Sequence, residues 1–347
     1  MQRLQIPLSF KSLICLIFLL LAALASGRAQ AQLFCVFDPQ GVTGDYYSMV
    51  QDYQLIARRW GVNLDLKVYT DESAVNTAFR NGQCDMANMI GMRARLFNKF
   101  TGTLDAPSVL ENYAEVRDAM ALVASPKLAS FMIDDGYEVV GVLPLGACFA
   151  MVKDRRINSL ERAVGKRVAI LAWDPTQPVL AEDFKVTPVP AEILDFGVLL
   201  NKGQVDAIVS PMLIYRALDL ERALGSKGGI IRRPLFEVTM QVLTHADRFP
   251  PDFGQKSRNY LLGQTDRALE IIRAQEQSVD AALWIYVDHD EVAEWNNTVR
   301  ATLDHMTRNG LFDRHMLAML KRVRCREMPD EPECAITPEQ RENIGHP

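Results

Sequence analysis

Apolar positions alternate along this chain between helical spacing and short continuous runs, and two passages repeat the same order of elements. Residues 78–88 read AFRNGQCDMAN, and residues 199–209 read LLNKGQVDAIV. Each holds the end of an apolar-periodic helix, a glycine suited to the left-handed position after a helix, and an apolar strand that opens with aspartate. Helix–glycine–strand turns are common in α/β proteins, so the repeat needs support from the rest of the chain. Two similar halves predict two lobes with a cleft, where small ligands bind.

The first half of the chain predicts a parallel sheet. In residues 46–60, apolar residues recur at a spacing of 3–4 between Asp45, a natural N-cap, and Gly61, a natural stop. Asp71 is expected to cap a second helix over residues 72–80. Strand–helix alternation with short loops favours parallel strands with right-handed crossovers. The predicted strands are residues 33–37, 64–68 and 84–90.

A second alternating unit begins near Ile157, after a mostly helical segment over residues 91–136. Predicted strands are 138–143, 148–152, 167–171, 186–189, 205–209 and 237–243; predicted helices are 175–183, 191–200, 212–223, 256–276, 278–286, 289–309 and 311–324. The strands near 148–152 and 237–243 are the expected crossings between lobes. We therefore predict lobe 1 from residues 32–147 and 244–347, with the C-terminal helices packed on it, and lobe 2 from residues 148–243.

The N-terminus predicts an export signal. Arg3 and Lys11 precede an unbroken apolar run over residues 13–25, and Ala29-Gln30-Ala31 supplies small residues for cleavage. This order is typical of a secretory signal peptide, so we predict residues 1–31 as a cleaved signal and the periplasm as the location. The run is shorter than the roughly 18 apolar residues of a membrane helix, and no later stretch approaches that length. The mature protein is expected not to be embedded in a membrane.

Charge and cysteine content narrow the class further. The signal segment carries three basic residues and no acidic one, so the net charge changes from −5 to −8 after cleavage. An acidic exported protein is unsuited to nucleic-acid binding, which relies on basic surface. We predict disulfides Cys35–Cys84, between neighbouring strands, and Cys325–Cys334, across a proline-bearing acidic loop, with Cys148 free.

Four stretches resemble exported solute-binding proteins of the two-lobed type II periplasmic fold, especially those of tripartite ATP-independent periplasmic (TRAP) transporters and their TAXI relatives. They are DPQGVTGDYYSMVQDY (38–53), FRNGQCDMANM (79–89), RRINSLERAVGKRVAI (155–170) and LLNKGQVDAIVSP (199–211). The likeness covers about residues 33–245, and the whole chain also resembles a group of uncharacterised bacterial solute-binding proteins. It implies an α/β fold with mainly parallel mixed sheets in each lobe and hinges made of strands. The resemblance also implies that the mature protein is a monomer and that its partner is a membrane permease.

One position departs from that family. TRAP binding proteins normally carry an arginine on the lobe 2 strand that follows the glycine matched by Gly165, and this arginine clamps the ligand carboxylate. Here the matching position is Ala169, while Arg167 lies two residues nearer the base of the strand. The carboxylate-binding mode therefore cannot be carried over.

Ligands of open α/β sheets collect beyond the C-terminal ends of the strands, near helix N-termini. This rule selects candidate ligand residues from the sequence without any catalytic motif. Thr43, like its neighbour Asp45, has the alternative role of helix cap, Arg93 and Arg95 that of ion-paired arginines, and Trp173 that of a core residue. The candidates are Asp38, Gln40, Gly41, Thr43, Gly44, Tyr69, Asn88, Arg93, Arg95, Trp173, Asp174, Gln177, Ser210 and Tyr215.

These residues mix acids with bases, so a zwitterion, a neutral polar compound and a small acid are all compatible. We predict capture of a small polar solute by hinge closure, without a cofactor, a metal or covalent chemistry. An envelope sensor or partner-binding protein on the same fold is one alternative. A periplasmic enzyme such as a dehydratase is another, although GxSxG, SxxK, HExxH and P-loop motifs are absent. Asp288-His289-Asp290-Glu291 has the composition of a metal cluster, but acidic residues are also expected at a helix start.

Overall fold

The computed structural model describes residues 31–329 and Cys334. Its strands form one ten-stranded sheet with the path β2-β1-β3-β9-β5-β8-β6-β7, to which β4 and β10 add at the sides. The bounds are β1 (Gln32–Phe37), β2 (Leu64–Tyr69), β3 (Met86–Ile90), β4 (Ile133–Asp134), β5 (Tyr137–Val152), β6 (Arg167–Leu171), β7 (Thr187–Ala191), β8 (Ala207–Pro211), β9 (Gly229–His245) and β10 (Trp284–Ile285). The cleavage site predicted after Ala31 depends on residues 1–30, which lie outside the described residues.

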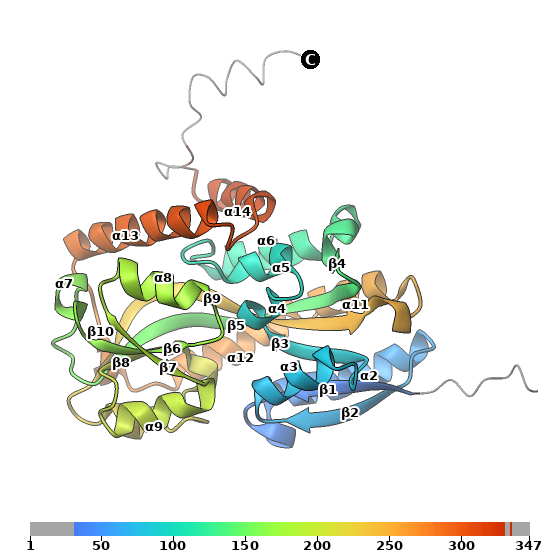
Figure 1. Cartoon of the computed structure of the whole chain (residues 1–347), viewed down its shortest axis with the longest axis horizontal. Helices are drawn as coiled ribbons and strands as arrows, with labels where there is room; N and C mark the ends of the chain where they lie inside the picture. The colour runs from blue at the N-terminus through green and yellow to red at the C-terminus, as the bar shows by residue number, and fades with distance from the viewer. Residues whose placement is uncertain (1–30, 330–333, 335–347) are drawn as a thin grey trace, which may run out of the picture.

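Two lobes share this sheet, as Figure 1 shows. The first contains β1 between β2 and β3, all parallel, and the second contains β6 between β7 and β8, also parallel. The long strands β5 and β9 run antiparallel to each other through both lobes, with β3 paired to β9 and β8 paired to β5. The predicted α/β two-lobed fold is confirmed, and the two expected sheets are joined into one by these strands.

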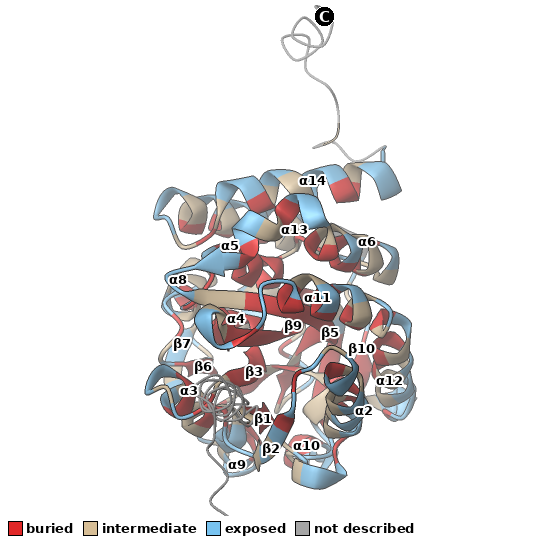
Figure 2. Cartoon of the chain, turned by 90° about the vertical axis from the view of Figure 1, so that its right-hand side faces the viewer, coloured by how far each residue is buried: buried red, intermediate tan, exposed pale blue. Residues whose placement is uncertain are grey.

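Helices cover the sheet, whose central strands β1, β3, β5, β8 and β9 are mostly buried in Figure 2. The edge strands β2 and β7 are mostly half-buried or exposed. The α-helices are α2 (Asp45–Arg59), α3 (Glu72–Arg80), α4 (Gly91–Ala94), α5 (Lys99–Gly102), α6 (Tyr113–Ala124), α7 (Leu160–Ala163), α8 (Thr176–Asp183), α9 (Phe196–Asn201), α10 (Leu220–Leu224), α11 (Phe253–Leu262), α12 (Thr265–Gln277), α13 (His289–Arg308) and α14 (Arg314–Glu327). The 3₁₀ turns are η1 (Gly41–Thr43), η2 (Thr103–Asp105), η3 (Pro126–Met132), η4 (Ile193–Asp195), η5 (Met212–Ile214), η6 (Ala246–Arg248) and η7 (Ala281–Leu283).

Local sequence explains several boundaries. The Asp71 side chain accepts a hydrogen bond from the Ser73 N–H at 2.9 Å and caps α3 as predicted. Asp45 is not the cap of α2, because the N-cap is Gly44 and Asp45 is the first helical residue. Both predicted disulfides are present: Cys35–Cys84 joins β1 to the entry of β3, and Cys325–Cys334 joins the last turn of α14 to Cys334. Cys148 is free and buried.

Several predicted elements are wrong, among them the single helix predicted over 256–276, which is divided into α11 and α12. The strands predicted at 138–143 and 148–152 are one strand, β5, whose register shifts around Gly141 and Gly146 let it continue past Pro144. The helix predicted over 212–223 is broken by Asp219, whose φ of 52° is left-handed. The helix predicted over 278–286 is instead η7 followed by β10, because Trp284 and Ile285 pair with β9.

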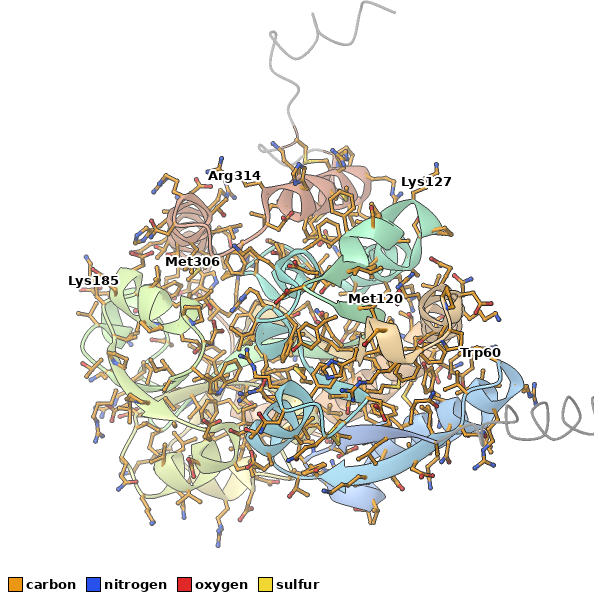
Figure 3. The ribbon with its side chains drawn as sticks, turned by 45° about the vertical axis from the view of Figure 1, so that its right-hand side comes forward. Trp60, Met120, Lys127, Lys185, Met306 and Arg314 are labelled. Carbon is orange, nitrogen blue, oxygen red and sulfur yellow. A yellow bond between two sulfur atoms is a disulfide. The ribbon has the colours of Figure 1, made fainter. Side chains whose placement is uncertain are left out.

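The C-terminal helices divide between the lobes. Helix α11 packs on β5 and α6, and α14 packs on α6 and η2, which agrees with the expected position on lobe 1. Helix α12 packs on β5 and on η5 of lobe 2, so it contacts both lobes. Helix α13 departs from that expectation, since it packs against α8 and α7 of lobe 2 (Figure 1). Met306 is buried between α13 and the body of the molecule (Figure 3). A helix that follows lobe 1 in the chain therefore covers the second lobe.

Candidate ligand site

A cavity of about 180 Å³ opens between the two lobes and continues into lobe 2. Lobe 1 contributes the loop after β1 together with Tyr46, Ile90 and Met92. The connecting strands β5 and β9 form its base, and β6, β8, α7 and α8 enclose the remainder, with Trp295 of α13 at one side. Residues from both lobes therefore face one enclosed space, which is the arrangement expected of a solute-binding cleft.

The lobe 2 part of the cavity is lined by aliphatic side chains. Ala150, Val168 and Val209 are half-buried although helices cover their sheet, because they face the cavity rather than a packed neighbour. The cavity adjoins a small second core that is separate from the main one and contains Val152, Ile157, Ala207, Ile231 and Ile285. Ala169, the position matched to the carboxylate-clamping arginine, also lines the cavity. A small apolar residue thus stands where a charged clamp was expected from the resemblance.

Asp38 lies at the lobe 1 wall of the cavity and is almost fully buried. Its Oδ1 accepts the Gln40 N–H at 2.9 Å, and its Oδ2 accepts the Tyr47 N–H at 3.0 Å, so the carboxylate caps the start of α2. A Cβ at Gly44 would lie 2.0 Å from this carboxylate, which explains the glycine there. Burial is the main cause of the raised pKa of Asp38, and backbone donors partly oppose it.

Two carboxyl groups, those of Asp38 and Asp45, lie at this wall of the cavity. Asp45 is exposed at the cavity rim and contributes to the raised pKa of Asp38. The Tyr46 hydroxyl donates to the Pro144 carbonyl oxygen, and burial together with Asp38 and Asp45 raises the pKa of Tyr46. Within the described ranges, no lysine or arginine forms an ion pair with Asp38 or Asp45. These two carboxylates therefore favour a positive or hydrogen-donating group.

Arg93 is buried and paired with protein carboxylates, although its Nη2 makes no hydrogen bond to a described residue. Its Nε donates to Glu72 Oε2 at 2.8 Å, and its Nη2 lies 3.6 Å from Glu192 Oε2 of lobe 2. The guanidinium lies 3.7 Å from the centre of the Trp173 ring, whose Nε1 donates to the same Glu192 oxygen at 3.2 Å. Burial raises the pKa of Glu72, and Arg93 lowers it in part. Arg93 and Trp173 thus join the two lobes to each other instead of lining the cavity.

Arg95 makes a second connection between the lobes. Its Nη2 donates to Asp174 Oδ1 at 2.5 Å and to Thr176 Oγ1 at 3.3 Å. The same Asp174 oxygen accepts the Thr176 N–H and hydroxyl, each at 3.0 Å, at the start of α8. Arg95 and Asp174 do not line the cavity. We call Arg95–Asp174 and Arg93–Glu192 the interlobe pairs.

The other sequence candidates separate into two groups. Asp38, Gln40, Gln177 and Ser210 line the cavity, and Gln177 Nε2 donates across the cleft to Met92 Sδ at 3.7 Å. The remaining ones have local roles or stand outside the lining. Asn88 extends the pairing of β1 and β3, with Oδ1 accepting from Phe37 N–H at 2.7 Å and Nδ2 donating to Phe37 O at 2.9 Å. Outside the lining lie Gly41, Thr43, Gly44, Tyr69, Asn88, Arg93, Arg95, Trp173, Asp174 and Tyr215.

Gly41 and Thr43 shape the loop after β1. Gly41 has a φ of +64°, a left-handed value that favours glycine, and Thr43 Oγ1 donates to the Gln40 carbonyl oxygen at 2.9 Å. Sequence reasoning missed the aliphatic lining of lobe 2. An alanine or valine that faces a cavity has the same strand pattern as one that faces a core. The one available signal was the alanine at position 169.

Buried acids lie beside the base of the cavity without forming it. Asp105 accepts hydrogen bonds from the Thr239 N–H at 3.1 Å and hydroxyl at 2.7 Å, and burial raises its pKa to about 7. Burial, with help from Glu276 and Asp105, raises the pKa of Glu237 to about 8. Burial also raises the pKa of the Cys148 thiol, which lines the cavity. These groups are mainly neutral at mildly acidic pH.

Metal and membrane features were searched in the described ranges only. There, no three His, Cys, Asp or Glu side chains come together as a metal ion would require. Asp288 is the N-cap of α13, and the side chains of His289 and Asp290 lie outside the described residues. No described helix combines the length and the apolar character needed to cross a membrane.

Solved structures share this fold. A TRAP periplasmic solute-binding protein from Desulfovibrio salexigens with bound orotic acid has a TM-score of 0.69 at 11% identity, covering 85% of this chain and 99% of that one. A TRAP periplasmic solute-binding protein from Chromohalobacter salexigens with bound D-glucuronate has a TM-score of 0.68 at 12% identity, covering 84% and 100%. At such low identity, these structures establish the two-lobed type II architecture.

The sequence relatives have a higher identity to this chain than these solved structures have. Probable solute-binding protein AdeT1 of Acinetobacter baumannii is 34% identical over 304 residues, which cover 88% of this chain and 100% of AdeT1. Probable solute-binding protein AdeT2 of the same organism is 22% identical over 240 residues, which cover 68% of this chain and 99% of AdeT2. The family model described as solute-binding protein AdeT 1/2 matches residues 54–339. The chain therefore belongs to the AdeT1/AdeT2 family of solute-binding proteins.

Proposed function

We propose that the protein captures a small solute between its lobes in the periplasm and delivers it to a membrane permease. The observation that carries this proposal is the cavity, which receives side chains from both lobes at the C-terminal ends of β1 and β6. Family membership supports binding as the role, and the relatives and structural neighbours are named as binding proteins rather than enzymes. The cleaved export signal, the permease and a monomeric state are parts of this proposal.

The hinge is assigned to β5 and β9. The register of β5 against β9 shifts between Val139 and Gly141 and again between Pro144 and Gly146, and such β-bulges bend strands locally. Gly146 has a φ of +106°, a value that residues with a side chain rarely adopt. We place lobe 1 at residues 32–147 and, of the described C-terminal part, 244–329 without α13, and lobe 2 at residues 148–243. Bending at these bulges changes the distance between Asp38 and Gln177, on opposite cavity walls, without breaking either lobe.

Native mass spectrometry of protein recovered from the periplasm of the producing cells tests the proposal. A noncovalent species of small-molecule mass should be retained, because a solute held between two lobes leaves only after opening. Small-angle X-ray scattering should then show a smaller radius of gyration for this sample than for protein stripped of ligand by unfolding and refolding. Absence of any retained or rebound species from periplasmic extract, together with an unchanged radius of gyration, would argue against solute capture.

A further inference from the structure

We propose that the solute is an apolar molecule, about the bulk of one substituted aromatic ring, that carries an amine at the Asp38 end and no carboxylate. This inference rests on the proposed function and names the ligand class of the same cavity. It narrows the polar solute expected from the sequence to one whose polarity is confined to one end. The structural neighbours described above were solved with bound carboxylic acids, so the inference separates this chain from them.

The aliphatic lining supports an apolar body. The lobe 2 walls are made of residues such as Ala150, Val168 and Leu180. These apolar side chains gain no hydrophobic free energy from contact with water, but they gain it when an apolar ligand replaces the water. An engineered apolar cavity of about 150 Å³ stays dry and binds benzene, and the present cavity is of similar size at about 180 Å³. A sugar or a dicarboxylate would leave several hydroxyl or carboxyl groups without partners here, which costs about 1–3 kcal/mol for each group.

Both arginines near the cleft are committed to protein carboxylates. Arg93 donates to Glu72 and lies 3.6 Å from Glu192, and Arg95 donates to Asp174. The buried Nη2 of Arg93 makes no hydrogen bond within the described part of the chain, but Arg93 does not line the cavity. Among the described lining residues there is no arginine or histidine, and the basic residue present is Lys166. Lys166 precedes β6, whereas the cleft lies beyond Leu171 at the other end of that strand, roughly 17 Å away at 3.3 Å per residue. A carboxylate at the Asp38 end of the cavity therefore has no cationic partner among the described lining residues.

Asp38 and Asp45 determine the polar end. Each Asp38 oxygen accepts one backbone N–H, so each retains acceptor capacity toward the cavity. Asp45 adds a second negative charge at the rim. Charges of the same sign disfavour a bound carboxylate, while an ammonium group gains a charge-assisted hydrogen bond. The geometry thus presents an apolar chamber with one anionic end.

A matched set of three probes tests the class: 3-phenylpropylamine, 3-phenylpropan-1-ol and 3-phenylpropanoate. Protein stripped of ligand by unfolding and refolding would be titrated with each probe by calorimetry at pH 7. We expect the amine to bind about tenfold more tightly than the alcohol, as expected of one charge-assisted hydrogen bond, and the propanoate not to bind. Equal affinity for amine and alcohol, or binding of the propanoate, would overturn the assignment of the anionic end.

Substitutions of residues that line the cavity test where the probe binds. Asp45→Asn should reduce the preference for amine over alcohol without affecting folding, because Asp45 is exposed, while Asp38→Asn should abolish the preference if the variant folds. Ala150→Phe should fill the chamber and eliminate binding of every probe, with a melting temperature no lower than that of wild type without ligand. Ala274→Phe, at an exposed position of α12, is the matched control and should bind as wild type does.

One further arm separates this inference from the proposed function. If D-glucuronate or a periplasmic extract binds and Ala150→Phe blocks that binding, while the phenylpropyl probes do not bind, the ligand class is overturned and solute capture stands. If neither the probes, nor D-glucuronate, nor the extract binds to wild type, then solute capture itself fails. Amine binding that survives Ala150→Phe would also overturn the inference, since the molecule would lie elsewhere.

Discussion

Arg95 of lobe 1 donates to Asp174 of lobe 2 at 2.5 Å, and the two side chains are only 5% and 0% exposed. The residues are 79 positions apart in the sequence and meet only when the lobes are close together. A buried charge that loses its partner is costly, so this pair stabilises the closed arrangement relative to any state that leaves one charge buried and unpaired. Opening of the cleft avoids this cost, because both charged groups then return to water.

Removing one partner should therefore shift the protein towards an open form. Arg95→Ala leaves the Asp174 carboxylate without its cation, at a cost of about 3–5 kcal/mol if the cleft stays closed. We expect an increased radius of gyration by small-angle X-ray scattering, with unchanged far-ultraviolet circular dichroism. Arg117→Ala is the control, because its pair with Asp266 is exposed and contributes about 0.2–1 kcal/mol. An unchanged radius for Arg95→Ala would mean that the pair does not govern closure.

Arg93→Ala should destabilise lobe 1 itself. It leaves Glu72, which is 3% exposed, without its cation, and burial already raises the pKa of Glu72. We expect a loss of about 3–5 kcal/mol in the free energy of unfolding measured by denaturant titration at pH 7. The double variant Glu72→Gln/Arg93→Ala should recover part of this loss. A single variant as stable as wild type would show that Glu72 is adequately solvated without Arg93.

Gly44→Ala should be unusually damaging for a glycine at an ordinary φ of −73°. The new methyl group would lie 2.0 Å from the Asp38 carboxylate and displace the cap of α2. We expect a loss of about 1–3 kcal/mol, which thermal unfolding would detect as a lowered melting temperature. Gly61→Ala is the control: its left-handed φ of +82° adds backbone strain, but no atom lies within 4 Å of its Cβ. A smaller loss at Gly44 than at Gly61 would contradict the collision.

Stability should decrease from mildly acidic to mildly alkaline pH because of Glu237. Its pKa rises from 4.5 to about 8 in the folded protein, so the folded state holds a proton that the unfolded state releases above pH 4.5. The folded state loses stability over this interval, and the loss is complete above about pH 8. Asp105, with a pKa of about 7, acts in the same direction over a narrower range.

Glu237→Gln should remove the larger part of this dependence. We expect the variant to gain melting temperature relative to wild type at pH 8 and to match it near pH 4.5, as measured by thermal unfolding at fixed ionic strength. An exposed acid, as in Asp266→Asn, should leave the wild-type profile unchanged. Parallel pH profiles for wild type and Glu237→Gln would show that Glu237 has the same pKa in the folded and the unfolded state.

Sequence patterns predicted the alternation of strands and helices, the two disulfides and the cap at Asp71, because each depends on local spacing or on strands that are neighbours in a parallel sheet. They did not predict that β5 is continuous, since Pro144 and Gly146 resemble a turn until the strand is paired with β9. They also selected Arg93 and Arg95 as ligand-binding residues, whereas both side chains pair with protein carboxylates and lie outside the cavity lining. Asp174 and Glu192 are contributed by the other lobe and Glu72 by α3 of the same lobe, and no local spacing specifies these partners.

Helix α13 gives the lobes a third mechanical coupling. The turn that follows it is fixed to lobe 1, where Lys99 Nζ donates to the Gly310 carbonyl oxygen and the Asp313 N–H donates to Thr103 Oγ1, each at 2.9 Å. The helix itself rests on lobe 2, with His305 Nδ1 3.2 Å from Asp183 Oδ2. Helix α13 therefore bridges the two lobes. Opening of the cleft requires α13 either to rotate about residues 309–313 or to lose its contacts with α8, so this helix limits how far the lobes can separate.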